Sequence, residues 1–375
     1  MTTFNWIDNP QALTNLITQL QTQAVIAVDT ESNSLYSYFE TVCLVQLSTL
    51  DADYIIDPLA VDISPLGSVF ASAAVEKIFH AAEYDVMSLK RDYGFQFARL
   101  FDTMLAAKIL GWPQCGLGNV LKTHFRVKVN KKFQQYNWGR RPLVKEALQY
   151  ARLDTHYLAR LRTRQLQELQ TQGRVDEARA AFDRICSAKT APKLFNPGDF
   201  RRIKGAKTLA PAQQAALQAL FVFRDERARH ANRPPFKVVQ DSVLIQLVQH
   251  PPRSVAELKQ VKGINSAVAD RHGRKILSLL RATHPAPAPP ERRARSHRFD
   301  EAALLRDAHL RSWRNELAHH RGVEPAVILS NGVLRAIARA NPAGLSQLKA
   351  QNILGRWQFK TYATEIVKTL KRCPH

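Results

Sequence analysis

Residues 24–31 read AVIAVDTE, and this stretch decides the fold of the N-terminal half of the chain. Its five apolar residues have the length of a buried strand, and two acids, Asp29 and Glu31, follow closely. Side chains of an extended chain alternate between faces, so the two carboxylates are predicted to share one face. One metal ion could bridge them. Acids after a strand also occur in ordinary turns, which is the commoner explanation of a lone Asp-X-Glu motif.

Further segments of strand length follow along the chain. Residues 42–49 (VCLVQLST) and 54–56 come after polar breaks, and with residues 24–28 they suggest an antiparallel meander of three strands. Residues 77–82 (KIFHAA) indicate another buried strand, which precedes a helical pattern. Helical periodicity then dominates from about residue 102 to residue 169. Strands first and strand–helix alternation later predict an α/β sheet flanked by helices.

Two more acidic clusters lie at the ends of apolar segments. Asp85 in FHAAEYD is expected near the start of a helix, where the helix dipole favours a carboxylate even without a metal. Tyr150 and Asp154 in YARLD are four residues apart, which places them on one face of a helix. A surface Tyr–Asp pair on an amphipathic helix explains that motif about as well. His80 could orient an acid or contact substrate, or it could be a satisfied residue at the end of a core strand.

The three clusters together pose an electrostatic problem. Four converging carboxylates repel one another unless divalent cations occupy the space between them. Such an arrangement suits two-metal cleavage of a phosphodiester bond. Tyr150 is a poor base at neutral pH because the phenol pKa lies near 10, so an orienting role toward the attacking water is expected.

Charge is distributed unevenly along the 375 residues, which are 45% apolar and favour two or three domains. Residues 1–190 contain 21 Lys and Arg against 19 Asp and Glu, whereas residues 191–375 contain 33 against 13. The basic half favours a polyanion, and nucleic acid is the expected partner. An anionic membrane is the weaker alternative, since no basic amphipathic helix with an aromatic apolar face stands out. Four scattered cysteines and the lack of a membrane-spanning stretch or leader favour a cytoplasmic location.

An internal repeat runs through the basic half at an offset of 90 residues. FRDERA at 223–228 matches WRNELA at 313–318. Further matches pair Pro235 with Pro325, Val243 with Val333, Leu244 with Leu334, Pro252 with Pro342, Leu258 with Leu348, Lys259 with Lys349, and Ile276 with Ile366. The segment between the copies is Pro-rich and basic, which is typical of a semi-rigid linker. Two small helical modules are predicted.

These motifs resemble the DEDD superfamily of 3′–5′ exonucleases, in the branch with tyrosine in its last motif, and the ribonuclease D family in particular. The resemblance covers about residues 4–170, and the repeat is similar to tandem HRDC domains. The matching stretches are VDTESNSLYSYFETVCLVQLST (28–49), FHAAEYDVMSL (79–89), FDTMLAAKILG (101–111), KKFQQYNWGRRPL (131–143) and YARLDTHYL (150–158).

The resemblance implies an α/β fold, with a ribonuclease H-like mixed-sheet exonuclease domain followed by two small all-α HRDC-type domains. The expected parts are the exonuclease domain at 1–190, the first HRDC-like domain at 205–283, a Pro-rich basic linker at 284–298, and the second HRDC-like domain at 299–375.

The resemblance also implies a site with two divalent metal ions, Mg²⁺ or Mn²⁺. Asp29, Glu31 and Asp154 would hold the first metal. Asp29 would also reach the second, where Asp85 acts directly or through water. Tyr150 would position the hydrolytic water.

A second set of matching positions is expected to contact substrate, with loop packing as the alternative role. Asn137 departs from the family pattern, where relatives often have aspartate before the tryptophan. Trp138 fits a core position better than a base-stacking platform. Leu35, Tyr36 and Phe39 could flank the 3′ end or simply pack an exposed turn. The substrate set comprises His80, Lys131, Gln134, Trp138 and Arg141.

The expected activity is metal-dependent 3′–5′ exoribonuclease cleavage that releases nucleoside 5′-monophosphates. RNA with a free 3′ end, such as a tRNA precursor or another structured RNA, is the expected substrate, and no membrane or obligate protein partner is evident. Two alternatives stay open. The same motifs serve DNA 3′–5′ exonucleases, and an inert catalytic fold could serve as a nonenzymatic nucleic-acid-binding scaffold.

Overall fold

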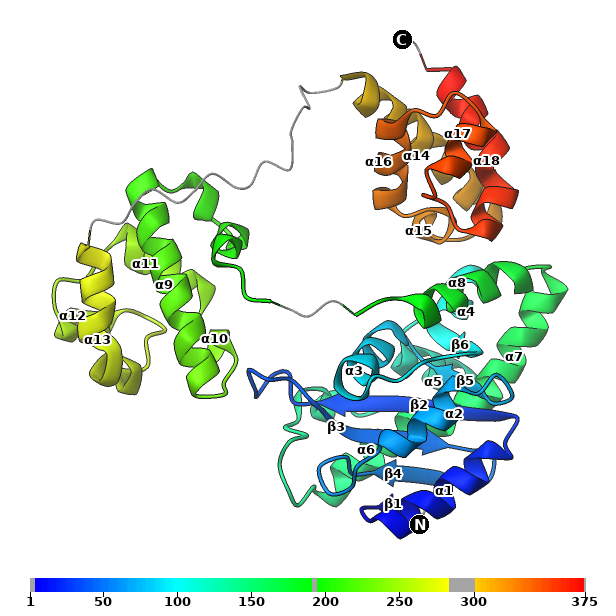
Figure 1. The fold of residues 1–375 in the computed structure, drawn as a ribbon, viewed down its shortest axis with the longest axis horizontal. Coiled ribbons are helices and arrows are strands. Elements are labelled where there is room, and N and C mark those ends of the chain that lie inside the picture. Colours follow the sequence, from blue (N-terminus) through cyan, green and yellow to red (C-terminus); the bar gives the residue numbers. More distant parts are fainter. Residues whose placement is uncertain (1–3, 191–193, 283–300, 374–375) are drawn as a thin grey trace. The chain divides into compact units, whose positions relative to one another are not determined.

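The structure is a computed structural model that describes residues 4–190, 194–282 and 301–373. The described residues form two compact units. One unit contains residues 4–31, 42–190 and 301–373, and the other contains residues 32–41 and 194–282 (Figure 1). The predicted linker at 284–298 lies outside the described residues.

A six-stranded mixed sheet organises the N-terminal half, in the order β1-β4-β3-β2-β5-β6. β3 and β4 are antiparallel, whereas β1 pairs with β4, β2 with β5, and β5 with β6 in parallel. β3 is buried along its whole length, because helices cover the sheet. The strands are β1 (Asn5–Ile7), β2 (Val25–Ser32), β3 (Val42–Ser48), β4 (Asp53–Ile56), β5 (Glu76–Phe79) and β6 (Leu100–Asp102).

The sheet agrees with the predicted α/β class and extends it. The predicted strands are present as β2 to β5, and β2, β3 and β4 are neighbours as expected. β1 and β6 were not expected, because three residues are too few to establish an alternating pattern. β6 lies at the start of the region that was interpreted as helical. Its pairing with β5 is a tertiary effect that local periodicity does not show.

Eight α-helices accompany the sheet among the described residues of the N-terminal half. Asn9 caps the first one, accepting a hydrogen bond from Ala12 N at 3.0 Å, as the Asn-Pro pair predicts. These helices are α1 (Pro10–Gln21), α2 (Gly67–Ala71), α3 (Glu83–Tyr93), α4 (Thr103–Leu110), α5 (Leu117–Phe125), α6 (Lys145–His156), α7 (Leu158–Thr171) and α8 (Val175–Ser187). Short 3₁₀ turns include η1 (Ser64–Leu66) and η2 (Lys131–Gln135).

Asp102 joins two of these helices at one buried carboxylate. Its Oδ1 accepts hydrogen bonds from Met104 N at 2.8 Å and Leu105 N at 3.0 Å, which caps α4. Its Oδ2 accepts from Ala82 N at 2.9 Å, in the turn that leads into α3. Asp102 therefore fixes the start of the helix that carries Asp85.

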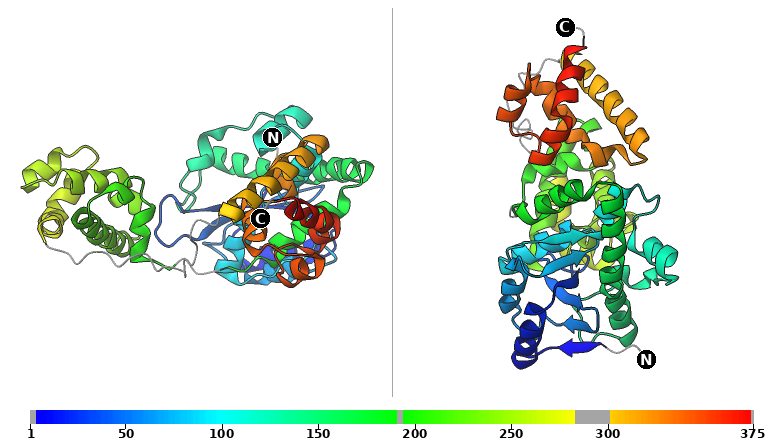
Figure 2. Two further views of the ribbon diagram at one scale, coloured as in Figure 1. Left: turned by 90° about the horizontal axis from the view of Figure 1, so that it is seen from above. Right: turned by 90° about the vertical axis from the view of Figure 1, so that its right-hand side faces the viewer.

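The basic half contains the two predicted helical modules, the first module at residues 194–282 and the second module at 301–373. Figure 2 shows their helices from two further directions. The first has 3₁₀ turns η3 (Pro197–Arg202) and η4 (Ala206–Thr208), then α9 (Pro211–His230), α10 (Pro235–Val238), α11 (Asp241–Gln249), α12 (Val255–Gln260) and α13 (Ser266–Arg281). The second has α14 (Glu301–Arg321), α15 (Pro325–Ile328), α16 (Asn331–Ala340), α17 (Leu345–Ala350) and α18 (Arg356–Lys371). Each helix of the second module starts 90 residues after its counterpart in the first module, which is the offset predicted from the sequence repeat.

A buried arginine shows that the repeat extends to side-chain contacts. Arg224 donates to Val239 O at 3.0 Å and to Asp241 Oδ1 at 2.7 Å. Its counterpart Arg314 donates to Leu329 O at 3.0 Å and to Asn331 Oδ1 at 2.8 Å. Each module also has its own apolar core, with Phe223 in the first and Trp313 packed against the second. The modules are thus two copies of one structure.

Within residues 4–190, 194–282 and 301–373, every helix is too short or too polar to cross a bilayer.

Candidate active site

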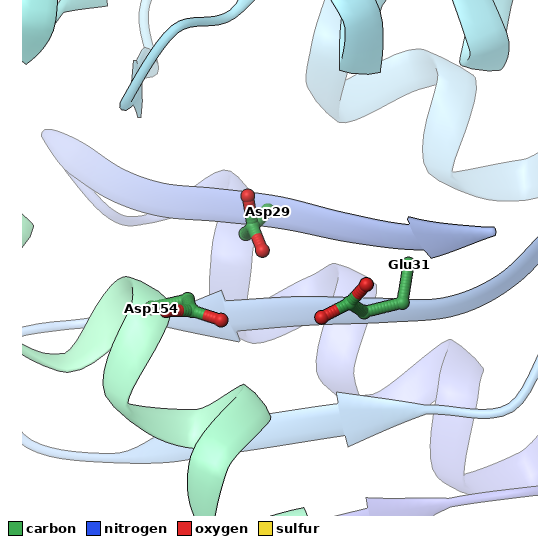
Figure 3. Close-up of side chains that lie close together, drawn as sticks. All are labelled: Asp29, Glu31 and Asp154. Atoms are coloured by element: carbon green, nitrogen blue, oxygen red, sulfur yellow. The ribbon is translucent and has the colours of Figure 1, made fainter. Parts of the chain in front are cut away.

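β2 carries the first two acids to the edge of a packed core. Ile26, Ala27 and Val28 are fully buried, and the strand continues past them through Asp29 and Glu31. Because side chains alternate along a strand, both carboxylates lie on the same side of β2. Figure 3 shows the two side chains from β2 and Asp154 from α6 facing a common space.

α6 brings the third acid to this space. One carboxylate oxygen each from Asp29, Glu31 and Asp154 lie within 4.8 Å of one another. Tyr150 lies one helical turn before Asp154 and is hydrogen-bonded to it. Three residues from a strand and a helix more than a hundred positions apart therefore converge, as the motifs predict.

Asp85 lies beside this group rather than within it. It occupies the first turn of α3 and is buried, and Thr30 Oγ1 donates a 2.5 Å hydrogen bond to its Oδ1. Thr30 stands between Asp29 and Glu31 in the sequence, so its side chain points to the opposite side of β2. The structure places the fourth acid next to the three-carboxylate cluster, with a threonine holding its orientation.

Burial and mutual repulsion disfavour the charged forms of these acids. Burial raises the pKa of Asp85 to about 7. Burial and then the charge of Asp85 raise the pKa of Asp154 to about 7. The pKa values of Asp29 and Glu31 are also raised well above their usual range, first by burial and then by the neighbouring carboxylates. Positive charge supplied by a cation would relieve this repulsion.

The donor set fits a hard divalent cation. Mg²⁺ and Mn²⁺ prefer oxygen ligands, and Mg²⁺ takes few carboxylates while keeping several waters. The three gathered carboxylates supply such oxygens at a spacing that one ion can span after small side-chain rotations. Asp85 offers a further carboxylate beside them.

An open cavity of about 320 Å³ gives access to the cluster. Asp29, Glu31, Tyr150 and Asp154 form one part of its lining. Residues that the sequence analysis missed form another part, with Gly116, Gly118 and Asn119 at the start of α5. Helix N-termini carry partial positive charge and backbone N–H groups, so this wall suits an anionic group. The Gly-X-Gly pair at 116–118 was the available signal, but it is weak without a strand before it.

The face of α6 behind the site is anchored by buried polar contacts. Arg152 Nη1 donates to Asp53 Oδ2 at 2.6 Å, and His156 Nδ1 lies 2.8 Å from the same oxygen. Ser48 Oγ donates to Asp53 Oδ1 at 2.7 Å. Asp53 thus ties α6 to the end of β3 and to β4. Tyr150 and Asp154 lie on the helix that these contacts hold.

Of the residues expected to contact substrate, Gln134 lines the cavity and His80 does not. Gln134 is exposed and lines the cavity. Lys131 lies in η2, and its side chain is outside the described residues. His80 lies away from the cavity lining, with Nδ1 2.9 Å from Thr103 Oγ1. Burial lowers the pKa of His80 to about 4, so its ring is neutral near pH 7.

The contacts of Trp138 and Arg141 fit loop packing, the alternative role given for them above. Trp138 is buried and stacks behind Tyr150, with ring centroids 6.3 Å apart. Arg141 donates to Asp57 Oδ2 at 2.6 Å and Oδ1 at 2.5 Å, and its remaining donors bind three backbone carbonyls. All five of its donors are therefore used within the protein. Asn137 Oδ1 accepts a hydrogen bond from Gly139 N at 3.2 Å, which supports this loop.

Comparisons with known proteins agree with this geometry. The sequence matches the family described as 3′-5′ exonuclease over residues 4–170, and the family described as HRDC domain over residues 213–280 and 304–370. The solved structure of Escherichia coli RNase D, described as an exoribonuclease involved in structured RNA processing, aligns over 100% of both chains. Its TM-score of 0.69 at 23% sequence identity is a likeness of fold.

Two curated relatives align with most of the chain. Exosome complex exonuclease RRP6 of Saccharomyces cerevisiae is 31% identical over 292 residues, which is 73% of this chain and 40% of that protein. The chain therefore spans less than half the length of that relative. Ribonuclease D of Acidiphilium cryptum is 30% identical over 286 residues, which is 75% of this chain and 72% of that protein. With this extent of alignment, and with the acidic motifs gathered as described, the chain belongs to the ribonuclease D family of 3′–5′ exonucleases.

Proposed function

We propose that the chain is a metal-dependent 3′–5′ exoribonuclease that hydrolyses the terminal phosphodiester bond and releases nucleoside 5′-monophosphates. The observation that carries the proposal is the convergence of the Asp29, Glu31 and Asp154 carboxylates on one cavity, with Tyr150 beside them. Family membership supports the polarity of the reaction.

Each residue of the site has a proposed task. Asp29, Glu31 and Asp154 would hold one divalent metal ion, and Asp29 with Asp85 would hold a second. Bound metal ions supply an activated water and stabilise the charge on the leaving oxygen. The Tyr150 hydroxyl group orients the attacking water. Burial and the nearby acids raise its pKa, so the phenol stays protonated and can donate a hydrogen bond.

The helix start at Gly116 and Gly118 is proposed to receive phosphate, because these residues line the same cavity as the acids and helix N-termini favour anions. Gln134 lies on that cavity and is proposed to contact the terminal nucleotide. The pKa shifts support a resting site that binds cations readily, since each carboxylate gains from a positive neighbour.

RNA is the proposed polymer, with precursors of tRNA and other structured RNAs as the substrate class. The excess of 33 Lys and Arg over 13 Asp and Glu in residues 191–375 supports binding of the RNA body through its phosphates. Mg²⁺ or Mn²⁺ is the proposed metal. The domain limits given above, a cytoplasmic location and independence from an obligate protein partner remain predictions.

Matched RNA and DNA oligonucleotides labelled at the 3′ end test the proposal. We expect stepwise loss of RNA from the 3′ end in Mg²⁺ or Mn²⁺, no loss in a chelator, and slower loss of DNA. Asp154→Ala should abolish hydrolysis while RNA binding is retained. Glu146→Gln is the matched control, because Glu146 is an exposed acid on the same helix. Faster loss of DNA would assign a DNA exonuclease, and no hydrolysis by the wild type would assign a binding scaffold.

A further inference from the structure

Residues 32–41, which begin one residue after Glu31, form a compact unit with the first helical module. The segment is closed on itself by Asn33. The Asn33 carbonyl oxygen accepts hydrogen bonds from Tyr36 N at 2.7 Å and Ser37 N at 2.9 Å, and its Oδ1 accepts from Thr41 N at 2.8 Å. The segment therefore behaves as one folded loop rather than as a free connection between two strands.

A single side-chain oxygen of the module holds the centre of this loop. Asn232 follows the C-terminal end of α9, and its Oδ1 accepts from Ser37 Oγ at 2.7 Å. The same oxygen accepts from the backbone N–H groups of Tyr38 and Phe39, both at 3.1 Å. Asn232 has φ of 44°, in the left-handed region that asparagine tolerates better than most residues. This backbone conformation directs the amide at the loop.

Two further side chains of the module complete the contact. The Tyr38 hydroxyl group donates to the Asp225 carboxylate, with O···O distances of 2.9 and 3.0 Å. Lys237 Nζ lies 3.7 Å from the centre of the Tyr36 ring, a close cation–π contact. Asp225, Asn232 and Lys237 together are called the docking edge below.

The second module lacks the docking edge although it repeats the rest of the structure. At the repeat offset, Asp225, Asn232 and Lys237 correspond to Asn315, Gly322 and Val327. Gly322 keeps the left-handed backbone, with φ of 62°, but has no side chain to accept a hydrogen bond. By contrast, the buried arginine of each module keeps its contacts. The two copies therefore differ at the residues that contact the loop and agree at those that maintain the module.

The corresponding edge of the second module has a different partner. Arg321 donates to Glu177 Oε1 of α8 at 3.1 Å and to the Tyr362 hydroxyl group at 2.8 Å. Val327 packs against the core of the N-terminal half. Alanine, Ala231, stands at the position of Arg321 in the first module. The same edge of the repeat thus contacts α8 in the second module and the loop at residues 32–41 in the first module.

We propose that the docking edge is dedicated to residues 32–41, and that through this loop the first module positions substrate for the nuclease. The proposal rests on the function proposed above. The loop continues directly from the metal-binding strand, and docking leaves Leu35 and Phe39 with 40% and 52% of their surface exposed. A loop ordered before substrate arrives binds more tightly, because its ordering entropy has already been lost. The first module is then a positioning element of the nuclease as well as an RNA-binding surface.

The test uses the whole 375-residue chain and changes one asparagine. Asn232→Gly removes the accepting oxygen, keeps the left-handed backbone, and installs the residue that the second module has at this position. Asn341→Gly is the matched control, because Asn341 also has a left-handed backbone, with φ of 41°, but lies in the second module. Asn232→Asp retains an accepting oxygen and serves as the rescue variant.

Hydrogen exchange measured by mass spectrometry reports docking independently of activity. We expect exchange of the amides in residues 32–41 to be about tenfold faster in Asn232→Gly, through loss of the hydrogen bonds to Oδ1. Asn341→Gly and Asn232→Asp should resemble the wild type. Unchanged exchange in Asn232→Gly would overturn the docking edge itself. Because no substrate is present, this result holds even if the nuclease proposal fails.

Steady-state cleavage of a short 3′-labelled oligonucleotide tests the positioning role. Asn232→Gly should raise KM several-fold and leave kcat within about twofold, since the chemistry of the carboxylates is untouched. Asn232→Asp and Asn341→Gly should both keep the wild-type KM. If exchange is faster while KM stays at the wild-type value, the docking is structural only and the positioning role is wrong.

Discussion

At the residue scale, the site is defined by buried carboxylates whose charged forms the fold disfavours. Burial raises the pKa values of Asp85 and Asp154 to about 7, against about 3.9 for a solvated aspartate. A raised carboxyl pKa stabilises the fold below the unfolded-state pKa, and that contribution is lost as the pH rises through the folded-state value. Metal-free protein therefore becomes less stable between about pH 4 and pH 7.

Thermal unfolding with and without metal checks this linkage. We expect the Tm of the metal-free protein to fall as the pH rises from about 4 to about 7, and the increase in Tm caused by Mn²⁺ to grow over the same interval. Metal ions and protons compete for the same oxygens, so the two effects have opposite signs. Asp154→Asn should reduce both. A metal-induced increase in Tm that is independent of pH would contradict the assignment of these carboxylates as ligands.

The residue scale also shows what the sequence could predict about the site. Strand alternation and helical spacing place Asp29 with Glu31 and Tyr150 with Asp154, because both patterns are local. Their assignment to one site came from the resemblance to the DEDD exonucleases. The role of Thr30 in holding Asp85 was missed, since it depends on two segments meeting in space. Trp138 and Arg141 match motif positions, but only their burial and hydrogen bonds distinguish support from substrate contact.

At the element scale, the position of α6 depends on a buried ion pair. Arg152 and Asp53 have side-chain exposures of 5% and 7%, so each charge relies on the other for compensation. His156 and Ser48 add contacts to the same carboxylate. No sequence pattern predicts this group, because its partners are about a hundred residues apart and lie on different elements.

Replacing Asp53 tests the importance of this anchor. Asp53→Ala leaves the buried Arg152 charge unpaired and should lower the free energy of unfolding by about 3–5 kcal/mol. It should also reduce kcat, because α6 carries Tyr150 and Asp154. Asp51→Ala is the control in the same turn, where the residue is exposed and the change should stay within about 0.5 kcal/mol. Urea denaturation measures both, and equal losses would contradict the anchoring role.

Element prediction succeeded where patterns are long and failed where they are short. The apolar run of β2 and the helical spacing of α6 exceed the length at which periodicity becomes informative. The repeat was visible because two copies can be compared with each other. β1 and β6 gain their structure from neighbouring strands, so their three residues carry little signal.

At the scale of the whole molecule, charge separates the catalytic part from the basic part. Arg271 and Arg274 are exposed on α13 of the first module. Arg160 and Arg164 are exposed on α7 of the N-terminal half. Replacing either pair of arginines removes two positive charges, so the same loss of charge can be compared between the two halves of the chain.

Salt dependence of RNA binding distinguishes the contributions of these halves. The double variant Arg271→Gln/Arg274→Gln should make the slope of log affinity against log salt shallower by about 1.4 for single-stranded RNA, if both residues contact phosphates. Arg160→Gln/Arg164→Gln should leave the slope nearly unchanged. Binding is measured in a chelator to prevent hydrolysis. Equal changes for both pairs would mean that the basic half has no special role.

Because of the loop at residues 32–41, the compact units of this chain do not coincide with continuous stretches of its sequence. β2 ends at Ser32, where the polypeptide enters the unit of the first module; it returns to the other unit at residue 42, and residues 194–282 belong again to the unit of the first module. Each compact unit is therefore built from segments that are separate in the sequence. A fragment cut at residue 190 would keep the Tyr38 and Phe39 donors and lose the Asn232 oxygen that accepts from them. The two repeat copies are each a separate helical module. The loop that follows the metal-binding strand, in contrast, depends on a residue of the first module, Asn232, which lies beyond the exonuclease motifs.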